Sequence, residues 1–296
     1  MRLGVLGWPV SHSRSPRMQN AALAATGLAE SWRYQLLPVP AELFEETVRA
    51  LPAAGFRGVN VTIPHKRAAL ALASEATPRA TAIGAANTLL FERDGRIRAD
   101  NTDAPALVQA LSHHAEVRGA SALVLGAGGS ARAAVWALID AGAREVLIWN
   151  RTPERAAKLA AEFGGLAVGP VGAVSVVSAV SAVSGVSAVS AVSAVSEAVP
   201  PAEFLINCTS VGLRDGGGLP DLQLHADRLG RHRVVVDFVY GEQETPLVRA
   251  ARASGVAVVD GLELLIGQGA LAFELFTGTP APRAAMRSTL GLSSAP

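Results

Sequence analysis

Short apolar runs alternate with helical patterns of apolar residues over the first hundred positions of the chain. Residues 3–6 and 58–63 are apolar runs of strand length and predict two strands. Ser15-Pro16, followed by the helical pattern of residues 18–25, predicts a helix with Ser15 as its cap and Pro16 in its first turn. Strands that alternate with helices in this way predict an α/β domain with a parallel or mixed sheet.

A second alternation of strands and helices begins after residue 103. Apolar runs predict strands at Ser121–Leu125, Glu145–Trp149, Phe204–Asn207, Val234–Asp237 and residues 256–259. A helix at residues 130–141 follows the first of these strands, after a glycine-rich turn. This order is typical of a doubly wound, Rossmann-like dinucleotide-binding domain.

The helical pattern of residues 262–277 is expected to fold back onto the first domain. We therefore predict an α/β substrate-binding domain of residues 1–103, completed by helices in residues 261–296. Residues 104–260 form the predicted Rossmann-like domain. A cleft between the two domains is the expected place for a ligand, because doubly wound sheets bind ligands at the carboxyl ends of their strands.

Composition narrows the class of protein. The chain has 296 residues, of which half are hydrophobic, and 26 basic against 25 acidic residues give a formal charge of +1. This balance gives no general attraction to nucleic acid or to an anionic membrane, so a small molecule is the expected partner. Cys208 is the only cysteine, which excludes an intrachain disulfide and a thiolate metal site, and no metal is expected. The apolar start is too short for a secretory signal, so we expect a cytoplasmic protein. The expected oligomeric state is a monomer or homodimer.

One segment needs separate treatment. Residues 164–196 carry no charge, which is long enough for a membrane span. Serine recurs there at every third position from Ser175 to Ser196, and the other residues are mostly valine and alanine. In a helix, a period of three drifts by about 60° per repeat, so the valines would spiral instead of forming one stripe. We predict a low-complexity surface insert at about residues 171–196; a membrane or partner-binding segment is the alternative.

The glycine-rich turn fits the dinucleotide-binding pattern G-x-G-x-x-G/A. It consists of Gly126, Ala127, Gly128, Gly129, Ser130 and Ala131. Gly126 would allow the tight turn, Gly128 the close approach of a phosphate, and Ala131 close packing of helix on strand. A diphosphate would then bind the N–H groups at the start of the helix. A plain structural turn is the alternative.

The residues after the second strand of this domain indicate which dinucleotide binds. In NAD-binding domains this strand normally ends in an acidic residue that holds the ribose hydroxyls. Here it ends in Trp149-Asn150-Arg151-Thr152, with Arg155 one helical turn later. Two arginines in place of a carboxylate would attract a 2′-phosphate, so the sequence favours NADP over NAD. A helix cap with solvated arginines is the alternative.

Lys66 and Asp103 are the candidate acid/base residues. Lys66 closes Asn60-Val61-Thr62-Ile63-Pro64-His65-Lys66 directly after a predicted strand, and Asp103 closes Asn101-Thr102-Asp103. A lysine can assist reduction of a carbonyl by donating a proton to the forming alkoxide. The alternatives are a solvated lysine and an aspartate that caps the next helix. Ser13 and Ser15, at a predicted helix start, could bind a carboxylate or cap the helix.

A series of ordered motifs resembles those of the shikimate dehydrogenase family, over residues 7–273. Residues 7–20 match G-x-P-x-x-H-S-x-S-P-x-x-H-N except for Gln19, residues 60–66 match N-V-T-x-P-x-K, residues 84–88 match G-A-x-N-T and residues 101–103 match N-T-D. Residues 207–210 match N-A-T-S with Cys208 for alanine, residues 237–247 contain D-x-x-Y and T-P-L, and residues 268–270 match Q-x-A.

The resemblance implies NADPH-dependent, reversible reduction of 3-dehydroshikimate to shikimate, in chorismate and aromatic amino acid biosynthesis. It implies that Lys66 and Asp103 form the catalytic pair. Ser13 and Ser15 would hold the substrate carboxylate, and the other implied substrate-binding residues are Asn60, Thr62, Asn87, Asp103, Tyr240 and Gln268. The implied NADP-binding residues are Gly126, Ala127, Gly128, Gly129, Ser130, Ala131, Asn150, Arg151, Thr152, Arg155, Thr209, Phe238, Gly261 and Leu264.

Two alternatives to this activity are open from the sequence. The first is a quinate/shikimate dehydrogenase that uses NAD; Ser15 counts against it, since the extra hydroxyl of quinate needs room near the carboxylate site. The second is a catalytically silent dinucleotide-binding regulator on the same scaffold. The presence of both Lys66 and Asp103 counts against a regulator.

Overall fold

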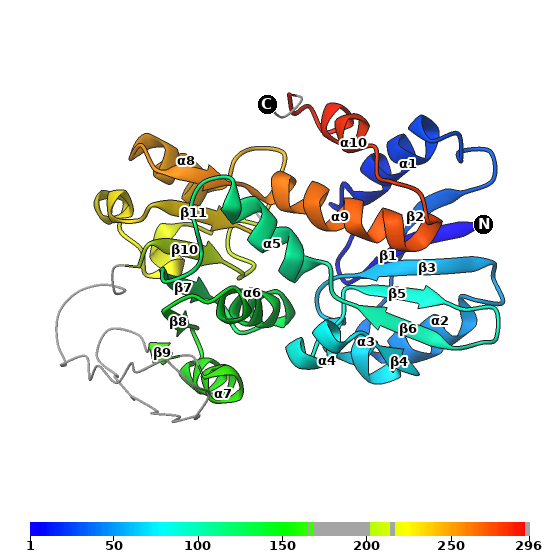
Figure 1. The fold of residues 1–296 in the computed structure, drawn as a ribbon, viewed down its shortest axis with the longest axis horizontal. Helices are drawn as coiled ribbons and strands as arrows, with labels where there is room; N and C mark the ends of the chain where they lie inside the picture. Colours follow the sequence, from blue (N-terminus) through cyan, green and yellow to red (C-terminus); the bar gives the residue numbers. More distant parts are fainter. Residues whose placement is uncertain (165, 169–201, 214–216, 294–296) are drawn as a thin grey trace. The chain divides into compact units, whose positions relative to one another are not determined.

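Twelve strands form two six-stranded sheets in the part of the chain that the structure describes (Figure 1). The structure is a computed structural model and describes residues 1–164, 166–168, 202–213 and 217–293, so the insert predicted at residues 171–196 lies outside the described residues. Contacts divide the chain into a first unit, of residues 1–106 and 265–296, and a second unit of residues 107–264. None of the described helices is long and apolar enough to cross a membrane.

The first unit contains a mixed sheet. Its strands are β1 (Arg2–Gly7), β2 (Arg33–Pro38), β3 (Phe56–Val61), β4 (Glu75–Ala76), β5 (Thr88–Phe91) and β6 (Ile97–Asp100), in the order β2-β1-β3-β5-β6-β4. β1 pairs in parallel with β2 and β3, whereas β5 is antiparallel to both β3 and β6. The predicted α/β class and the strand at residues 3–6 are confirmed.

The predicted strand at residues 58–63 extends too far. β3 ends at Val61, because the N–H of His65 donates to the carbonyl of Thr62 and turns the chain. Pro64 has no N–H to offer a neighbouring strand, which also disfavours continuation of the sheet. The polar end of this segment therefore leaves the sheet at its carboxyl edge and leads into a helix.

Helices cover both faces of the first sheet. They are α1 (Ser15–Ala25), η1 (Ala41–Leu43), α2 (Phe44–Ala50), α3 (Lys66–Leu72), α4 (Pro78–Ile83), α10 (Arg283–Thr289) and, in part, α5 (Asp103–Ser112) and α9 (Gly261–Thr277). The residues of α2 and α3 belong to the apolar core on one face. On the other face β3 packs against α9, since a Cβ on Gly58 would lie 2.5 Å from the ring of Phe276.

The start of α1 differs from the prediction. Arg14 is the N-cap residue and Ser15 is the first residue of the helix, so the prediction of Ser15 as the cap is wrong. Ser13 takes part instead, because its hydroxyl accepts from the N–H of Ser15 at 3.3 Å. Pro16 lies in the first turn, as predicted, where a missing N–H leaves no helical hydrogen bond unmade.

The second unit contains a fully parallel sheet. Its strands are β7 (Ser121–Leu125), β8 (Glu145–Trp149), β9 (Leu166–Val168), β10 (Phe204–Asn207), β11 (Val234–Asp237) and β12 (Ala257–Val259). The order β12-β11-β10-β7-β8-β9 becomes 6-5-4-1-2-3 when these strands are numbered within the unit. That is the strand order of the doubly wound dinucleotide-binding fold, so the predicted Rossmann-like sheet is confirmed.

Alternate residues of β7 show why this strand is apolar from Ala122 to Leu125. Ala122 and Val124 enter the core that also contains residues of α5, α6 (Gly129–Asp140) and α7 (Pro153–Phe163). Leu123 and Leu125 enter the opposite core, with residues of η2 (Leu219–Leu222), η3 (Ala226–Arg231) and α8 (Pro246–Ala253). A parallel strand covered on both faces has to be apolar at every position, whereas a strand with one solvated face alternates.

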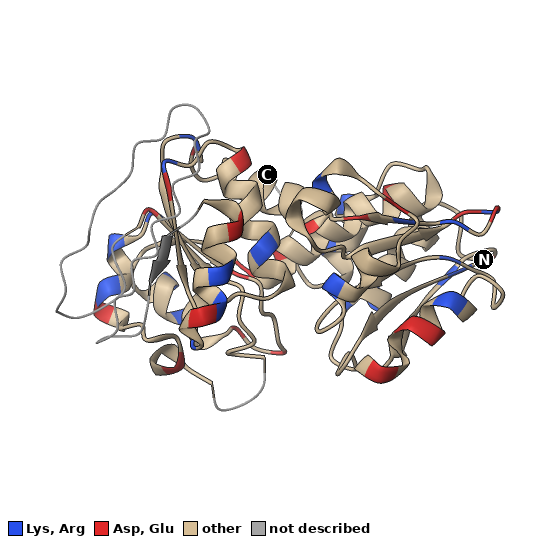
Figure 2. Cartoon of the chain, turned by 90° about the horizontal axis from the view of Figure 1, so that it is seen from below, with Lys and Arg blue, Asp and Glu red and all other residues tan. Residues whose placement is uncertain are grey.

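Basic and acidic residues are interspersed in the described parts of both units (Figure 2). Several form exposed ion pairs, such as Arg49 with Glu45 at 2.9 Å. Exposed pairs of this kind contribute about 0–1 kcal/mol each, because water screens them and ordering two long side chains opposes them. Apolar burial therefore accounts for the fold, and the few buried charges are the ones that need a separate explanation.

Candidate active site

A buried ion pair joins the first residues of two helices in the first unit. Lys66 begins α3, directly after the turn that follows β3, and Asp103 begins α5, directly after β6. Lys66 Nζ donates to Asp103 Oδ2 at 2.7 Å, and the two residues are only 8% and 7% exposed. Each charge is the partner that burial of the other requires. The alternative of an ordinary solvated lysine is therefore wrong.

The second oxygen of the Asp103 carboxylate is also held. Asn87, between α4 and β5, donates from Nδ2 to Asp103 Oδ1 at 2.8 Å and to Thr102 Oγ1 at 2.9 Å. Gln268 in α9 approaches the same amide, with its Oε1 3.4 Å from Asn87 Nδ2. The structure thus brings together four of the residues predicted from the motifs, Lys66, Asn87, Asp103 and Gln268, around one carboxylate.

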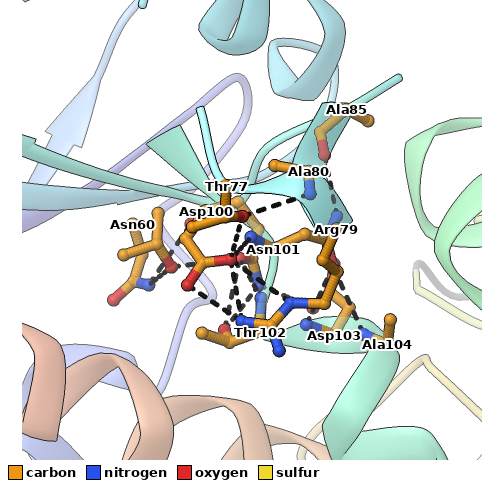
Figure 3. Close-up of polar contacts among 12 residues, drawn as sticks. Asn60, Thr77, Arg79, Ala80, Ala85, Asp100, Asn101, Thr102, Asp103 and Ala104 are labelled. Carbon is orange, nitrogen blue, oxygen red and sulfur yellow. Dashed lines mark hydrogen bonds and ion pairs between the residues drawn. The ribbon is translucent and has the colours of Figure 1, made fainter. Parts of the chain in front are cut away.

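Asn101 explains why the Asp103 side chain is available for this role. Its Oδ1 accepts from the backbone N–H groups of Asp103 and Ala104, and so caps α5 (Figure 3). The alternative in which Asp103 caps the helix is wrong for this reason. Since the cap comes from a neighbouring asparagine, both carboxylate oxygens of Asp103 face side chains and not its own helix.

Asn60, at the end of β3, lies in a connected network with Asn87. Its Nδ2 donates to Thr88 Oγ1 at 3.1 Å and to the carbonyl of Asn87 at 3.3 Å. Its Oδ1 accepts from the hydroxyl of Tyr34 at 2.8 Å. A buried amide held by three partners has a single orientation, so Asn60 fixes the polar pattern on this side of the candidate site.

The other predicted substrate residues of the first unit lie after the carboxyl ends of β1 and β3, Ser13 and Thr62 on loops and Ser15 at the start of α1. Ser15 is buried, whereas Ser13 and Thr62 are half-buried. The N–H of Thr62 donates to the carbonyl of Leu6, and a Cβ on Gly7 would lie 2.4 Å from Thr62 Cγ2. The glycine at the end of β1 therefore allows the two loops to approach closely, with Thr62 at the contact.

His65 lies next to Lys66 in the chain but makes different contacts. Its ring stacks on Phe44 with centroids 4.4 Å apart, and its Nε2 lies 2.7 Å from the carbonyl of Val39. Burial lowers the pKa of His65, and the hydrogen bond to Val39 only partly opposes that effect. The neutral ring thus anchors the start of α3 to the loop after β2, so its role is structural.

In the second unit, the glycine loop has the geometry that the motif predicts for Gly126. This residue has φ +110° and its N–H donates to the carbonyl of Trp149 at 2.7 Å. A Cβ here would lie 3.1 Å from the backbone of Cys208, so both conformation and space require glycine. Gly126 therefore lies where the chain leaves β7 and turns toward α6, next to the backbone that follows β10.

The start of α6 can accept an anion. Its N-cap residue is Gly128, which has no side chain to cap the helix, and a Cβ added there would meet nothing within 4 Å. The first turn contains Gly129, Ser130 and Ala131, of which Ala131 is fully buried against the sheet. Backbone N–H groups next to open space at a helix start fit a diphosphate, as the motif predicts for a dinucleotide.

The segment after β8 is exposed. Asn150 Nδ2 donates to the carbonyl of Thr152 at 2.9 Å and shapes the turn into α7, of which Thr152 is the N-cap residue. Arg151 and Arg155 are both exposed, and β8 does not end in a carboxylate residue. The two guanidinium groups are thus accessible to a ligand phosphate, and the hydroxyl of Thr152 makes no cap hydrogen bond.

A buried carboxylate that the sequence interpretation left out of the site lies at the end of β11. Asp237 is fully buried; its Oδ1 accepts from Asn207 Nδ2 at 2.9 Å and from the N–H of Val239 at 3.0 Å, and its Oδ2 accepts from the hydroxyl of Thr245 at 2.6 Å. Burial raises the pKa of Asp237 to about 6, despite the opposing effect of these hydrogen bonds. Its presence in the D-x-x-Y motif was the available signal.

This carboxylate orders two loops that carry predicted cofactor residues. Because Nδ2 of Asn207 faces Asp237, Oδ1 of Asn207 points to Thr209 and accepts from its N–H and its hydroxyl, at 3.0 and 2.8 Å. Phe238 follows Asp237 directly and packs against the core of the sheet. The network therefore fixes the chain at the carboxyl ends of β10 and β11, the edge at which doubly wound sheets bind their ligands.

Three predicted residues remain. Gly261 begins α9, and a Cβ on it would lie 2.4 Å from the carbonyl of Val239, so only glycine allows this close approach. Leu264 is buried in the core of the second unit. Tyr240 is half-buried after β11 and belongs to the second unit, unlike the other predicted substrate residues.

Comparisons with known proteins agree with these features. Residues 5–89 match the family model described as shikimate dehydrogenase substrate binding domain, residues 108–207 match shikimate / quinate 5-dehydrogenase, and residues 261–290 match shikimate 5'-dehydrogenase C-terminal domain. A protein of Methylobacterium radiotolerans named shikimate dehydrogenase (NADP(+)) is 44% identical over an alignment of 287 residues, and the alignment covers 95% of this chain and 93% of the relative.

Solved structures give the same result. The shikimate 5-dehydrogenase of Thermus thermophilus, in complex with NADP(H) and shikimate, is similar with a TM-score of 0.77 and 38% identity over 98% of both chains. The shikimate dehydrogenase of Aquifex aeolicus is similar with a TM-score of 0.81 and 32% identity, over 98% of this chain and 97% of that one. The sequence motifs, the two sheets and the relatives together show that this chain belongs to the shikimate dehydrogenase family.

Proposed function

We propose that this protein is an NADP-dependent shikimate dehydrogenase, which reversibly reduces 3-dehydroshikimate to shikimate. The observation that carries this proposal is the buried pair of Lys66 and Asp103 at 2.7 Å, in a chain that also has a dinucleotide-type loop at Gly126. The names of the relatives, which specify NADP(+), support the same activity. The reaction supplies shikimate to the biosynthesis of chorismate and aromatic amino acids.

Lys66 is the proposed proton carrier. In the direction of reduction its ammonium donates a proton to the oxygen as negative charge develops there, and in the direction of oxidation its neutral amine takes that proton from the reacting hydroxyl. Asp103 accepts from Lys66 and, through the lone pairs that Lys66 and Asn87 leave, can also accept from the substrate hydroxyl. Bound NADP supplies the nicotinamide that accepts the hydride.

Polar residues of the first unit, together with Tyr240 of the second, are the proposed substrate contacts. Ser13 and Ser15 at the start of α1 suit a carboxylate, since hydroxyls and helix N–H groups both donate there. Asn60, Thr62, Asn87, Gln268 and Tyr240 suit the ring hydroxyls. A site that binds hydroxyl groups by hydrogen bonds rejects analogues that lack them, because buried polar groups would then have no partner.

The proposed cofactor contacts are all in the second unit. N–H groups of residues 126–131 would hold the diphosphate, and Asn150, Arg151, Thr152 and Arg155 would hold the ribose and its 2′-phosphate. Thr209 and Phe238, on loops that the Asp237 network orders, and Gly261 and Leu264, in the first turn of α9, would line the nicotinamide end. We propose residues 104–260 as the cofactor-binding domain and residues 1–103 with 261–296 as the substrate-binding domain, with Tyr240, Gly261 and Leu264 as the contacts that depart from this division.

Initial rates with two acids and two cofactors test this proposal. Shikimate with NADP should give the highest kcat/KM, and shikimate with NAD and quinate with NADP should both be lower by at least about 10-fold, which corresponds to about 1.4 kcal/mol of discrimination. Preference for NAD and quinate would replace the proposal by the quinate/shikimate alternative. No turnover of shikimate with either cofactor would leave the silent regulator as the better explanation.

The proposed partner is this small-molecule substrate, in a cytoplasmic enzyme that acts as a monomer or homodimer. The proposed cytoplasmic location follows from the proposed pathway, which uses cytoplasmic NADPH. Sedimentation analysis should give a mass of 30.4 kDa or twice that value. A larger assembly would contradict the proposed oligomeric state without affecting the proposed reaction.

A further inference from the structure

A second buried carboxylate lies next to the candidate catalytic residues, and the proposed mechanism does not use it. Asp100 is the last residue of β6, directly before Asn101-Thr102-Asp103, and is only 4% exposed. Arg79 in α4 binds it with one edge of its guanidinium: Nη2 lies 2.8 Å from Oδ1 and 2.9 Å from Oδ2, and Nε lies 3.3 Å from Oδ1 (Figure 3). Arg79 and Asp100 are 21 residues apart in the sequence, so the pair joins α4 to the Asn-Thr-Asp turn.

Two further donors complete the environment of Asp100. The hydroxyl of Thr77, the N-cap residue of α4, donates to Asp100 Oδ1 at 2.8 Å, and the same hydroxyl accepts from the N–H of Ala80. The N–H of Asn101 donates to Asp100 Oδ1 at 2.7 Å. The carboxylate therefore fixes the start of α4 and the first peptide of the Asn-Thr-Asp turn at the same time, and charge-assisted hydrogen bonds of this kind are short and strong.

The turn passes this constraint on to Asp103. Asn101 Nδ2 donates to the carbonyl of Ala85 at 2.9 Å, and its Oδ1 caps α5 at Asp103 and Ala104 (Figure 3). The N–H of Asn87 donates to the carbonyl of Asp100 at 3.1 Å. Asn101, whose Oδ1 accepts from the Asp103 N–H, and Asn87, whose Nδ2 donates to the Asp103 carboxylate, are thus both attached to Asp100 of the Arg79–Asp100 pair.

We propose that Arg79 and Asp100 form a positioning pair that sets where the Asp103 carboxylate lies between Lys66 and Asn87. The proposal rests on the proposed dehydrogenase function, because it assigns a purpose to the placement of Asp103. Arg79 touches neither Lys66 nor the proposed reacting atoms. A misplacement of about 1 Å at a reacting group costs about 100-fold in rate, so a pair that fixes this turn affects turnover without contacting substrate.

Kinetics of Arg79→Met and Arg79→Lys test the proposal. Arg79→Met should lower kcat about 10- to 100-fold and leave KM for NADP within about two-fold, because the cofactor residues are in the other unit. Arg79→Lys should lie between Arg79→Met and the wild type, since an ammonium keeps the charge but not the two-pronged contact. Arg98→Met is the matched control. Arg98 lies on β6, as Asp100 does, and forms an exposed ion pair with Glu92 at 3.7 Å, so this variant should leave kcat unchanged.

A double-mutant cycle separates positioning from a general loss of stability. In the background of Asp103→Asn, Arg79→Met should lower kcat by less than about two-fold, since there is no catalytic carboxylate left to place. An equal loss in both backgrounds would overturn the proposal, because a merely structural role acts independently of Asp103.

A crystal structure of Arg79→Met gives a result that needs no turnover. The separation of Lys66 Nζ and Asp103 Oδ2 should increase from 2.7 Å to beyond hydrogen-bond distance. Retention of the 2.7 Å contact would overturn the positioning role whatever the activity. Absence of shikimate turnover by the wild-type protein would instead overturn the proposed function, so the two failures are distinct.

Discussion

Protonation of Asp237 should change the stability of the second unit at mildly acidic pH. The carboxyl is fully buried at the end of β11, with donors from Asn207, Val239 and Thr245. Burial raises its pKa from the ordinary 3.8 to about 6 in the folded chain. The informative substitution is Asp237→Asn, which keeps the shape of the side chain and removes its titration.

The size of the effect follows from the pKa difference between the folded and unfolded chains. A value of about 6 in the folded chain and 3.8 in the unfolded chain differ by about 2 units, or about 3 kcal/mol. Because the folded-state pKa is the higher one, this contribution is fully present below about pH 4 and is lost as the pH rises to about 6. Over that range, the free energy of unfolding of the wild type should fall by about 1.4 kcal/mol per pH unit relative to Asp237→Asn.

Urea-induced unfolding at pH steps from about 4 to about 7, followed by circular dichroism, measures this difference. The matched control is Asp227→Asn in η3, which removes an exposed carboxylate from the same unit and should not produce a pH-dependent difference of this size. Curves of the wild type and Asp237→Asn that keep a constant offset over the whole range would refute the reasoning. They would show that the carboxyl has the same pKa in the folded and unfolded chains.

Substitutions in the proposed cofactor loops give two more tests. Arg151→Ala and Arg155→Ala should each raise KM for NADP about 10-fold but leave KM for NAD within about two-fold, because each removes a charge-assisted hydrogen bond to the 2′-phosphate. The control Lys158→Ala, exposed on the same helix, should change neither value, and equal losses with both cofactors would contradict the assignment. Gly126→Ala should lower the free energy of unfolding by about 1–3 kcal/mol and weaken NADP binding in calorimetry, since alanine does not tolerate φ +110° with the backbone of Cys208 3.1 Å away. Unchanged Tm and Kd would show that the loop adapts.

The framework could be predicted from the sequence because hydrophobic patterning determines it. The apolar run of residues 122–125 predicted the strand β7, whose side chains enter two cores on opposite faces. Predictions failed at the ends of elements, where local hydrogen bonds decide. β3 stops at Val61 because of the turn at Thr62, and α1 takes Arg14 instead of Ser15 as its N-cap residue. Apolar periodicity contains no information on such contacts.

The candidate site could be predicted only in part for a similar reason. Motifs identified Lys66 and Asp103, whose 2.7 Å contact spans 37 residues of sequence. They did not identify Arg79, Asp100 or Asp237, because hydrogen bonds between distant segments leave no spacing signal in one chain. Asp100 stands directly before Asn-Thr-Asp and Asp237 opens D-x-x-Y, so position next to a motif was the only available indication.

Lys66 is the proposed carrier of the proton in the oxidation of shikimate by NADP. The most direct test is the initial rate of NADPH formation from shikimate and NADP by the wild type, Lys66→Ala and the control Arg67→Ala, which changes the exposed neighbour. We predict wild-type turnover in Arg67→Ala and a kcat lower by about 100-fold or more in Lys66→Ala. Equal kcat values for Lys66→Ala and the wild type would contradict the account.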